Sequence, residues 1–497
     1  MRSPVRTWSS APNSRQSRFP PGERLSSFTT FASTPATSSA IKPTGTQLAL
    51  FVLIAAGLSL WTINLLYGRP LFIDEANVAR NLYDRGYAAL FAPLDHDQYA
   101  PPLYLMAGKF LGDVFGYAEI PLRIPAFLGG LLAVYGLYKS GRYLDLGPWV
   151  LLPLAFLFVN PTVLRYVGEI KPYGLDLGIA ALLIALRLRP RQRKEVWRWT
   201  VIGTIAPWLS LPSVFVLAAV GLLRLRTDWR YSLAIGAWLL SFAGLYFTVL
   251  RPSVGSGYLN SFHAEYFFPL ATSWEELLQT GRIIFRMLRL SYGFTVVALV
   301  WGGALLVTGM LRLPTRRLWL LLPLLVAMGA STLRLYSLID RLLLFALPGV
   351  WLFTALSARS VYASLGKARP VALLLTVAVL GGTNIYRSFY EPVRFSDGRK
   401  LAEIARTAGA YTLHPDAVPV VEYYRRIHPQ TSKEWVKKVG SGADHVLIYD
   451  VTTRESTRQT IRRDSIGAAE RGCNVLAEKL YRSGVLRLRC PVPNSDP

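Results

Sequence analysis

The chain has 497 residues, of which 52% are hydrophobic and only 17% are charged. With a mean hydropathy of +0.31, this composition excludes an ordinary soluble enzyme and indicates a protein with many membrane-spanning helices. The formal net charge of +25 does not indicate nucleic-acid binding, because the basic residues cluster in short loops between apolar segments. That distribution is typical of the cytoplasmic loops of membrane proteins. We therefore expect an α-helical polytopic membrane protein with no nucleic-acid partner.

Residues 1–45 are rich in Ser, Thr, Pro and Arg and contain no apolar run. A segment of this composition cannot bury a core, so we expect a disordered cytoplasmic tail. A signal peptide is the alternative, but the first apolar stretch begins only after residue 45 and lacks a clear cleavage site. That stretch, 48–67, contains no charged residue, and its helix would be roughly 30 Å long, which matches the hydrocarbon core of a bilayer.

Two adjacent carboxylates, Asp74 and Glu75, follow a few residues beyond this first span, where the chain leaves the membrane. We interpret them as the chemical centre of the protein, on the side of the membrane opposite the N-terminus. The alternative is that Asp74 only caps the next helix, because Asp is a favoured N-cap residue and the apolar spacing after it is helical.

The polar run after these carboxylates ends in His96, Asp97 and Tyr99, just before two consecutive prolines. The prolines fix an extended entry into the next apolar segment, so these three side chains are candidates for substrate contacts near the membrane surface. His96 is also a candidate ligand of a divalent metal, together with Asp74, Glu75 or Asp97. A histidine that is simply solvated in a loop is the alternative.

Ten more apolar segments follow, separated by loops that carry the basic clusters. We assign the basic clusters to the cytoplasmic side, which places residues 251–290 and 334–341 outside with Asp74. The length of a spanning helix leads us to expect about 11 to 13 spans. The apolar segments lie near 101–117, 121–138, 147–164, 172–188, 199–223, 231–250, 291–311, 318–333, 342–358 and 370–386.

Placing the basic clusters on the cytoplasmic side requires two segments that do not simply cross the membrane once. Both flanks of 199–223 are basic, so we expect a pair of short helices bent at Pro207 and Pro212. If every segment between 101 and 188 crossed the membrane once, the basic residues 187–198 would lie outside. One of these segments is therefore re-entrant or divided, and the sequence does not say which.

Charged residues also occur next to apolar sequence, at Arg123, Glu169, Lys171, Asp340 and Arg341. Ionisable groups are costly at such positions unless they pair or line a wet cavity, so each is a functional candidate. The alternative is that they lie at helix ends and extend to the lipid headgroups. If the cations converge near the carboxylates, the site has the groups needed to transfer a group from a phosphate ester.

From residue 387 to 497 the composition becomes that of a soluble domain, which we expect to be a small extracytoplasmic α/β domain. Residues 418–421 and 445–449 are predicted as buried strands, and 455–482 has helical spacing. Cys473 and Cys490 are either a disulfide or two unpaired buried cysteines. No Gly-rich phosphate loop, metal-spaced histidines or nucleophile elbow occurs, which leaves the chemistry to residues 46–386, with the first outer loop at 68–100.

Five short motifs occur in order along the chain: Asp74-Glu75, Tyr99-Ala100-Pro101-Pro102-Leu103-Tyr104, Leu122-Arg123-Ile124-Pro125, Lys171-Pro172-Tyr173 and Asp340-Arg341 before an apolar run. Together they resemble the GT-C class of membrane glycosyltransferases over about residues 48–386. The likeness is greatest to the bacterial branch related to protein O-mannosyltransferases, lipid A aminoarabinose transferases and the lipopolysaccharide-core galacturonosyltransferases of rhizobia. Tyr99 departs from the pattern, because relatives usually have histidine there.

The resemblance implies transfer of a sugar from a polyprenyl-phosphate donor to a lipid, glycan or protein acceptor, with inversion at the anomeric carbon. The reaction would take place on the outer face of the cell membrane. It needs a general base for the acceptor hydroxyl and cations for the charge that develops on the leaving phosphate. Asp74 matches the family's catalytic carboxylate, and Glu75 would assist or orient it.

The remaining site residues are implied in the same way. Arg123, Lys171 and Arg341 are the candidates for contacts to the donor phosphate. Members of the class differ in metal dependence, and the residues next to Asp74 do not decide between a metal-dependent and a metal-free reaction. The candidate substrate-binding residues are His96, Asp97, Tyr99, Glu169, Tyr173 and Asp340.

Two other functions are compatible with a protein that has many membrane spans and charged residues buried among them. A transporter or flippase of a lipid-linked or anionic substrate would be expected to contain an internal repeat with broken helices in corresponding halves, and the sequence shows no such repeat. A structural membrane subunit, whose C-terminal domain binds a partner and whose carboxylate is idle, is the third possibility.

Overall fold

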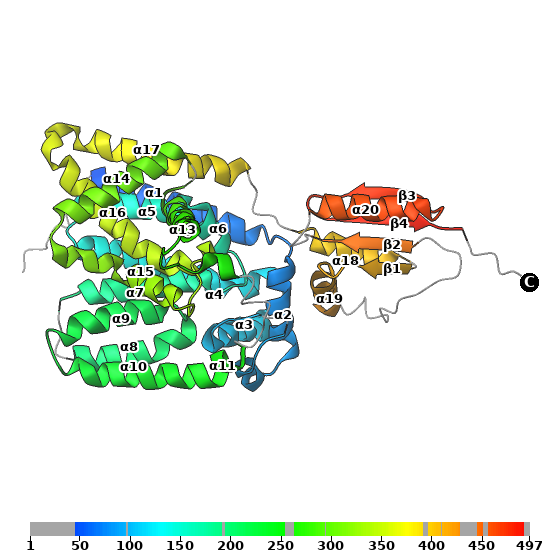
Figure 1. The fold of residues 1–497 in the computed structure, drawn as a ribbon, viewed down its shortest axis with the longest axis horizontal. Helices are drawn as coiled ribbons and strands as arrows, with labels where there is room; N and C mark the ends of the chain where they lie inside the picture. The colour runs from blue at the N-terminus through cyan, green and yellow to red at the C-terminus, as the bar shows by residue number, and fades with distance from the viewer. Residues whose placement is uncertain are drawn as a thin grey trace, which may run out of the picture. The chain divides into compact units, whose positions relative to one another are not determined.

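The computed structural model describes residues 45–491, except 96–97, 191–193, 254–262, 294, 391–395, 409, 428–444 and 451–455. The predicted N-terminal tail therefore lies outside the described residues, apart from its last residue. The first part of the chain is a bundle of helices, most of which run in roughly one direction in Figure 1. These helices are α1 (Gly45–Leu66), α2 (Ile73–Asp84), α3 (Pro102–Phe115), α4 (Glu119–Tyr143), α5 (Leu151–Val159), α6 (Pro161–Tyr166), α7 (Tyr173–Leu188), α8 (Glu195–Leu209), α9 (Ser213–Leu225), α10 (Tyr231–Leu245), α11 (Arg251–Ser253), α13 (Trp274–Tyr292), α14 (Val296–Arg312), α15 (Leu322–Thr332), α16 (Leu347–Val361) and α17 (Arg369–Tyr390).

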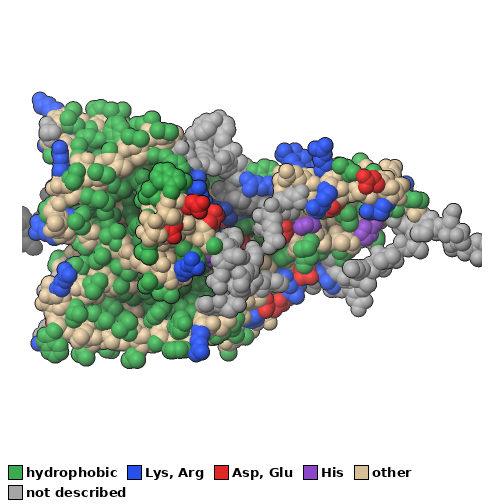
Figure 2. Space-filling model, in the orientation of Figure 1, with side chains coloured by type: hydrophobic (Ala, Val, Ile, Leu, Met, Phe, Trp, Pro, Cys, Tyr) green, Lys and Arg blue, Asp and Glu red, His purple; other side chains and the backbone are tan. Residues whose placement is uncertain are grey.

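Apolar side chains cover most of the visible surface of the bundle, and basic side chains fringe its left edge in Figure 2. Among the described residues, four helical stretches are long and apolar enough to cross a bilayer by themselves. A fifth is added if α13 and α14, which meet at 97°, count as one broken span. The expected class, a polytopic helical membrane protein, is confirmed. The four stretches are Gly45–Leu66, Glu119–Tyr143, Tyr231–Leu250 and Asp340–Val361.

Helix α3 does not carry the chain across the bundle. It lies in the apolar segment 101–117, one of the segments among which the sequence required a re-entrant or divided one. The segment before α3 is tied to α2 by the backbone N–H of Asp95, which donates to Asn81 Oδ1 (3.0 Å). Directly after α3, Glu119 accepts from Arg399 (2.8 Å), whose other arm donates to the carbonyl of Gly68 at the end of α1 (2.7 Å). Both ends of α3 therefore lie near the same end of α1.

The position of α3 explains why the basic residues 187–198 would lie on the wrong side if every apolar segment between 101 and 188 crossed the membrane once. With α3 outside the count, α4, α5 and α7 carry the chain along the bundle three times, so the basic residues at the end of α7 and the start of α8 lie at the end of the bundle where α1 begins. The chain continues through α8, α9, α10, α14, α15, α16 and α17. The expected number of 11 to 13 spans stays a prediction, because four described stretches, or five with the bent pair, meet the length and composition of a span.

Two helix breaks follow from local sequence. The predicted pair of short helices in 199–223 is confirmed as α8 and α9, with the break at Ser210–Pro212, while Pro207 is accommodated inside α8. The apolar segment 147–164 is also divided, because Asn160 ends α5 and caps α6 by accepting from the N–H groups of Thr162 and Val163.

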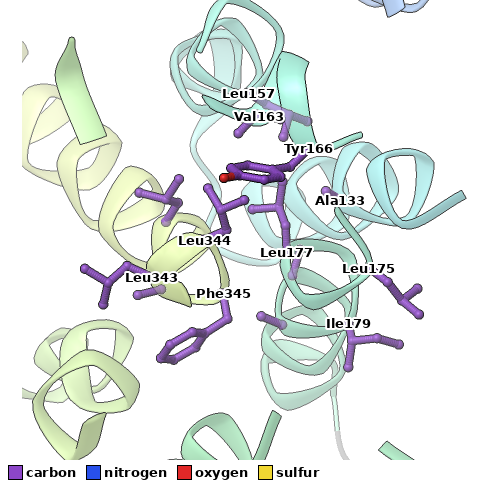
Figure 3. Close-up of a cluster of buried hydrophobic side chains, with 14 of the residues drawn as sticks. Ala133, Leu157, Val163, Tyr166, Leu175, Leu177, Ile179, Leu343, Leu344 and Phe345 are labelled. Atoms are coloured by element: carbon purple, nitrogen blue, oxygen red, sulfur yellow. The ribbon is translucent and has the colours of Figure 1, made fainter. Parts of the chain in front are cut away.

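The core of the bundle fixes a short 3₁₀ helix, η6 (Asp340–Ala346), against α7. Figure 3 shows Leu343, Leu344 and Phe345 of η6 beside Leu177 of α7. All four side chains are almost completely buried. Burying one such side chain stabilises the fold by roughly 1.5–3 kcal/mol. The packing of Leu343, Leu344 and Phe345 therefore fixes the position of Asp340 and Arg341 at the start of η6.

The C-terminal part contains a four-stranded sheet in the order β1-β2-β4-β3, in which β1 and β2 are parallel and the other pairs antiparallel. The expected α/β class of this part is confirmed. Its elements are α18 (Gly398–Thr407), β1 (Ala410–Leu413), α19 (Val418–Ile427), β2 (His445–Tyr449), α20 (Thr457–Glu470), β3 (Asn474–Lys479) and β4 (Gly484–Arg489).

The strand prediction for 445–449 is confirmed by β2, but the prediction for 418–421 is wrong, because these residues begin helix α19. Ala417, Val420, Val421 and Tyr424 are buried there at helical spacing, and Tyr423 widens the same face. The helix predicted over 455–482 ends at Glu470, and its second half forms strand β3.

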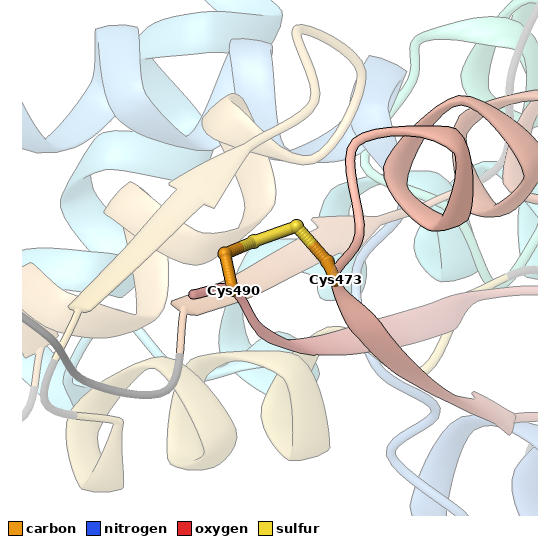
Figure 4. Close-up of a disulfide and its surroundings, with 2 residues drawn as sticks. All are labelled: Cys473 and Cys490. Atoms are coloured by element: carbon orange, nitrogen blue, oxygen red, sulfur yellow. A yellow bond between two sulfur atoms is a disulfide. The ribbon is translucent and has the colours of Figure 1, made fainter. Parts of the chain in front are cut away.

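A disulfide joins Cys473 and Cys490 across the outer ends of β3 and β4 (Figure 4). The two cysteines are 17 residues apart in the sequence. Closing a loop of this length in the unfolded chain stabilises the folded state by about 3 kcal/mol in the chain-entropy model.

Replacing both cysteines with serine should therefore make the C-terminal part of the full-length protein easier to unfold, by about 3 kcal/mol. Urea-dependent proteolysis of the protein in detergent, read with an antibody to the C-terminus, would measure the shift. The single variant Cys473→Ser should match the double variant, because either change removes the bond. A midpoint equal to that of the unreduced wild type would contradict this prediction.

Candidate functional site

Asp74 and Glu75 lie in the first turn of α2, and they point into different surroundings. The N-cap of α2 is Phe72, which makes no side-chain capping bond, so the interpretation of Asp74 as the cap is wrong. Adjacent residues on a helix are about 100° apart, so one of the two carboxylates can face the core while the other faces outward. The Glu75 side chain is 0% exposed, whereas the Asp74 side chain is 34% exposed.

Glu75 is the centre of a fully buried ion-pair network. Its carboxylate accepts from Arg69 (2.8 Å), twice from Arg123 (3.0 and 3.1 Å) and from the backbone N–H of Ile170 (3.0 Å). Burial alone would raise the pKa of Glu75, but the charges of Arg123 and Arg69 outweigh it and lower the pKa. Glu75 is therefore an ionised anchor that ties α2 to α4 and to the loop before α7.

Arg123 was expected to contact the donor phosphate, and the structure places it elsewhere. Its side chain is 1% exposed, and its Nη1 donates to the backbone carbonyl of Arg69 (2.9 Å) while Nε and the other Nη donate to Glu75. The physical reason is the cost of a buried carboxylate, which must be matched by cations with good geometry. Arg123 positions Glu75 and does not face Asp74.

A second pair of charges continues this network. Arg69 donates to the carbonyl of Gly168 (3.1 Å) and lies 3.7 Å from Glu169, which also accepts from Arg165 (2.7 Å). The Glu169 side chain is 1% exposed, so the geometry favours a structural role for it over the expected substrate contact. The Arg165 side chain stays 29% exposed, and its guanidinium lies over the Phe72 ring, 5.3 Å from the ring centre.

The cations beside Asp74 are Arg341 and Lys171. Arg341, in η6, reaches 3.8 Å from the Asp74 carboxylate and lies over the ring of Tyr173 at 6.0 Å. Lys171 is within electrostatic range of both Asp74 and Arg341, and its Nζ donates to Gln98 Oε1 (2.5 Å). The structure thus brings together residues from three separate motifs: the start of α2, the loop before α7 and the start of η6.

Aromatic side chains form the floor of this group. Tyr173 packs edge-on against Tyr166, with ring centres 4.9 Å apart, and Tyr166 is within electrostatic range of Asp74, Arg165 and Arg341. Aromatic faces beside cations make cation–π contacts and offer flat apolar surface for packing.

The other predicted residues are less central. Asp340 pairs with Arg289 of α13 (3.3 Å), and the Tyr99 hydroxyl is buried with no hydrogen-bond partner in the part of the chain that the structure describes. His96 and Asp97 lie outside the described residues. Within the described residues no group of three or more His, Cys, Asp or Glu side chains could hold a metal ion, so the metal interpretation of His96 stays a prediction.

Sequence reasoning missed Arg69 and Arg165. Arg69 had a usable signal, because a cation directly after the outer end of the first span opposes the positive-inside pattern and so requires a partner. Arg165 stands four residues before Glu169, the spacing at which opposite charges meet on a helix. Neither signal says which other helix the pair contacts.

The C-terminal part also contacts the segment that leads into α2. Tyr424 of α19 accepts from the backbone N–H of Leu71 (2.9 Å) and donates to Glu119 of α4 (2.5 Å). Arg399 of α18 donates to Glu119 and to the carbonyl of Gly68, as described above. Leu71 is only three residues before Asp74, so this domain helps to position the start of α2.

Tyr424→Phe should lower activity without unfolding the protein, because it removes one hydrogen bond to backbone and one to a carboxylate while keeping the buried ring. We expect a loss of about 1–3 kcal/mol in stability, since the Leu71 N–H is left unpaired. Comparing turnover and thermal stability with those of Tyr481→Phe, a change at a more exposed tyrosine in the same domain, would test it. Full activity in Tyr424→Phe would contradict a positioning role.

No family model matches the sequence, and no curated protein does. Among solved structures, ArnT from Cupriavidus metallidurans matches in two states. The apo structure has 14% identity and a TM-score of 0.49, and the match covers 89% of this chain and 98% of that one. The structure bound to undecaprenyl phosphate has 14% identity and a TM-score of 0.51, and covers 88% of this chain and 98% of that one. The second match shows a shared fold, and the GT-C fold expected from the motifs is confirmed.

Proposed function

We propose that this chain, which has the fold of GT-C transferases, is itself a glycosyltransferase that moves a sugar from a polyprenyl-phosphate donor to an acceptor hydroxyl. The observation that carries the proposal is the Asp74–Arg341 pair. A partly exposed carboxylate lies 3.8 Å from a partly exposed guanidinium, while the neighbouring Glu75 is buried and neutralised. The acid and the cation that the reaction needs therefore meet where a ligand can reach them.

The donor phosphate would bind Arg341 and Lys171. Arginine can hold two phosphate oxygens with parallel N–H bonds, and a lysine ammonium supplies a point charge. One of the ArnT structures contains undecaprenyl phosphate, an isoprenoid phosphate of the class proposed here. Arg165, which was not among the predicted residues, is a further candidate for a phosphate contact. Its side chain is partly exposed, and both Arg165 and Arg341 lie within electrostatic range of Tyr166. Arg123 is not among the proposed phosphate contacts, because its buried side chain is paired with Glu75.

Donor binding would also prepare the base. A phosphate between Arg341 and Lys171 competes with Asp74 for the guanidinium, which releases the carboxylate to accept a proton. Asp74 then takes the proton of the acceptor hydroxyl as the hydroxyl oxygen attacks the anomeric carbon. The bond from that carbon to the phosphate oxygen breaks, and the polyprenyl phosphate leaves with the electron pair, stabilised by the two cations. One displacement of this kind inverts the anomeric carbon.

The remaining assignments complete the proposal. Tyr173 and Tyr99 are the side chains proposed to stack on the sugar or bond to its hydroxyls, and Asp340 orients Arg289 beside η6. The acceptor is a lipid, glycan or protein on the extracytoplasmic face of the cell membrane. Residues 1–45 form the cytoplasmic tail, residues 46–386 form the transferase domain, and residues 387–497 form the extracytoplasmic domain.

Arg341→Gln should raise the KM for the donor by about 10-fold or more, since hydrogen bonds to charged groups contribute about 1.5–3 kcal/mol each. Arg341→Lys should recover part of this loss, because it restores the charge without the paired N–H groups. Arg282→Gln on helix α13 removes an arginine that belongs to no part of the proposed site and should leave KM unchanged. Equal KM values for Arg341→Gln and the control would contradict the phosphate contact.

Lys171 should give the donor KM a pH dependence. Burial lowers the pKa of the Lys171 ammonium, although the nearby Asp74 charge opposes this. The charged form is lost as pH rises through the lowered pKa, so KM should begin to rise at a lower pH than an ordinary lysine would cause. Lys171→Arg, which stays charged, should flatten the alkaline limb of the profile. An unchanged profile would contradict the assignment.

The proposal is tested with membrane vesicles given a polyprenyl-phosphate carrying a labelled sugar. The account expects the label to leave the polyprenyl carrier and join an acceptor in vesicles containing the wild-type chain, and not in vesicles without it. Movement of intact labelled donor across the vesicle membrane with no transfer would favour a transporter or flippase and would overturn the proposal.

A further inference from the structure

A cavity of about 970 Å³ lies at the end of the bundle away from Asp74. Helix α1 begins at this cavity with Gly45 and ends at Leu66, and its 22 residues span roughly 33 Å. Helix α16 likewise begins just after η6, which contains Arg341, and reaches the cavity with Arg359 near its end. Two separate helices therefore place the cavity and the proposed active site at opposite ends of the bundle.

The walls of the cavity are apolar and come from helices distant in sequence. Leu53 of α1, Ala155 of α5, Leu356 of α16 and Leu373 of α17 contribute to it. Trp149, which also lines it, stacks on Tyr362 with ring centres 5.5 Å apart. Tryptophan and tyrosine gather at the level of lipid headgroups, so this part of the cavity is at the depth where a headgroup meets its chains.

The rim is strongly basic. The charged residues among its lining are Arg316, Arg317, Arg359 and Arg369 against Asp145 alone. Arg359 is fixed there, because its guanidinium donates to the backbone carbonyls of Leu144 and Asp145 at the end of α4. Four arginines around an apolar hollow favour a ligand with an anionic end and hydrocarbon chains.

We propose that this cavity binds one anionic phospholipid of the leaflet opposite the active site. Its phosphate would lie among the four arginines, and its acyl chains would follow the apolar faces of α1 and α17. The volume of the cavity lies within the range of about 300–1,000 Å³ that is usual for ligand pockets. The sequence before Gly45 carries five arginines against one glutamate over residues 2–24, so its composition is not that of the anionic ligand that a basic rim favours.

The test compares two double variants of the full-length protein by native mass spectrometry. Arg316→Gln with Arg317→Gln removes two rim charges, whereas Arg226→Gln with Arg230→Gln removes two arginines from another basic loop that does not line the cavity. Each protein is purified in detergent and then mixed with phosphatidylglycerol, phosphatidylethanolamine or phosphatidylcholine.

We expect the wild type and the control variant to retain one phosphatidylglycerol, at least 10-fold in preference to the zwitterionic lipids, and the rim variant to lose that preference. Equal retention of all three lipids by the wild type would overturn the proposal, because it would mean that any bilayer lipid fills the cavity. Equal loss in the two variants would overturn it as well, because it would trace binding to the general basic charge of this face. Sugar transfer is not the readout, so the result is independent of the proposed active site.

Discussion

Asp74→Asn is expected to abolish sugar transfer while leaving donor binding intact. The amide is nearly isosteric with the carboxylate but cannot accept the proton of the acceptor hydroxyl, and positioned general bases contribute about 10²–10⁴-fold to rate. Because the change also removes the negative charge that competes for Arg341, the affinity for the polyprenyl phosphate should stay equal or rise. Initial rates of label transfer and equilibrium binding of the same donor would be measured on one preparation.

A matched control for this variant is available in the same helix. Asp84, at the C-terminal end of α2, pairs with Arg426 and is 42% exposed. Asp84→Asn has the same chemistry at a position far from η6, so it should keep most of the transfer rate. A transfer rate in Asp74→Asn within a few fold of that in Asp84→Asn would contradict the general-base role.

Glu75→Gln is expected to be the most destabilising single change in the site. Arg69 and Arg123 are both about 1% exposed. The variant removes the carboxylate that both of them contact, which leaves Arg69 with only the longer contact to Glu169 (3.7 Å) among its described ion pairs. Breaking a buried ion pair by removing one partner typically costs about 3–5 kcal/mol, because the remaining charges stay buried and uncompensated. Thermal unfolding of the protein in detergent, read from tryptophan fluorescence, would show the loss as a lower midpoint.

The pH dependence of the wild type supplies an independent measurement. The folded-state pKa of Glu75 is lowered, so its contribution to stability is fully present above the ordinary carboxyl pKa and is lost as pH falls below that value and through the lowered pKa. Glu75→Gln should therefore flatten the acid limb of stability against pH. Glu265→Gln, which breaks an exposed pair with Arg286, should cost under about 1 kcal/mol. Equal costs at the two positions would contradict the anchoring role.

The part of the fold that the sequence predicts is the part governed by bilayer thickness and charge asymmetry. The basic loops and the apolar segments between them were enough to identify the broken pair α8 and α9, since two basic flanks require a return. Helix α3 could not be separated from a span in this way. Its 14 residues lie in a largely apolar stretch but include Lys109 and Asp113, and the contacts of Asp95 and Glu119 near its two ends show that it stays on one side.

Within the site, the type of residue was predictable and its partner was not. A charge in apolar sequence indicates that something compensates it, which singled out Arg123, Lys171 and Arg341 together. A cation that holds an anionic ligand and a cation that neutralises a buried carboxylate give the same sequence signal, because both are charges in apolar sequence that need a partner. Arg123 is of the second kind because α4 packs it onto Glu75, whereas η6 delivers Arg341 to the exposed Asp74. That difference arises from helix packing between segments far apart in the sequence.

The C-terminal domain shows the same limit. Val420 and Val421 read as a strand when only their β-branched type is considered, yet Tyr423 and Tyr424 extend the buried face into a helix that packs on α2. The hydrogen bonds of Tyr424 to Leu71 and Glu119 depend on a contact between residues about 300 to 350 positions apart. No local pattern carries that information.

The most direct measurement of the central claim is a structure of the protein in lipid nanodiscs with a bound polyprenyl phosphate. The account predicts the phosphate within hydrogen-bonding distance of Arg341 and Lys171, with the Asp74 carboxylate released from Arg341 and facing an open path for the acceptor. A phosphate bound elsewhere, with Asp74 and Arg341 still paired and solvated, would contradict it.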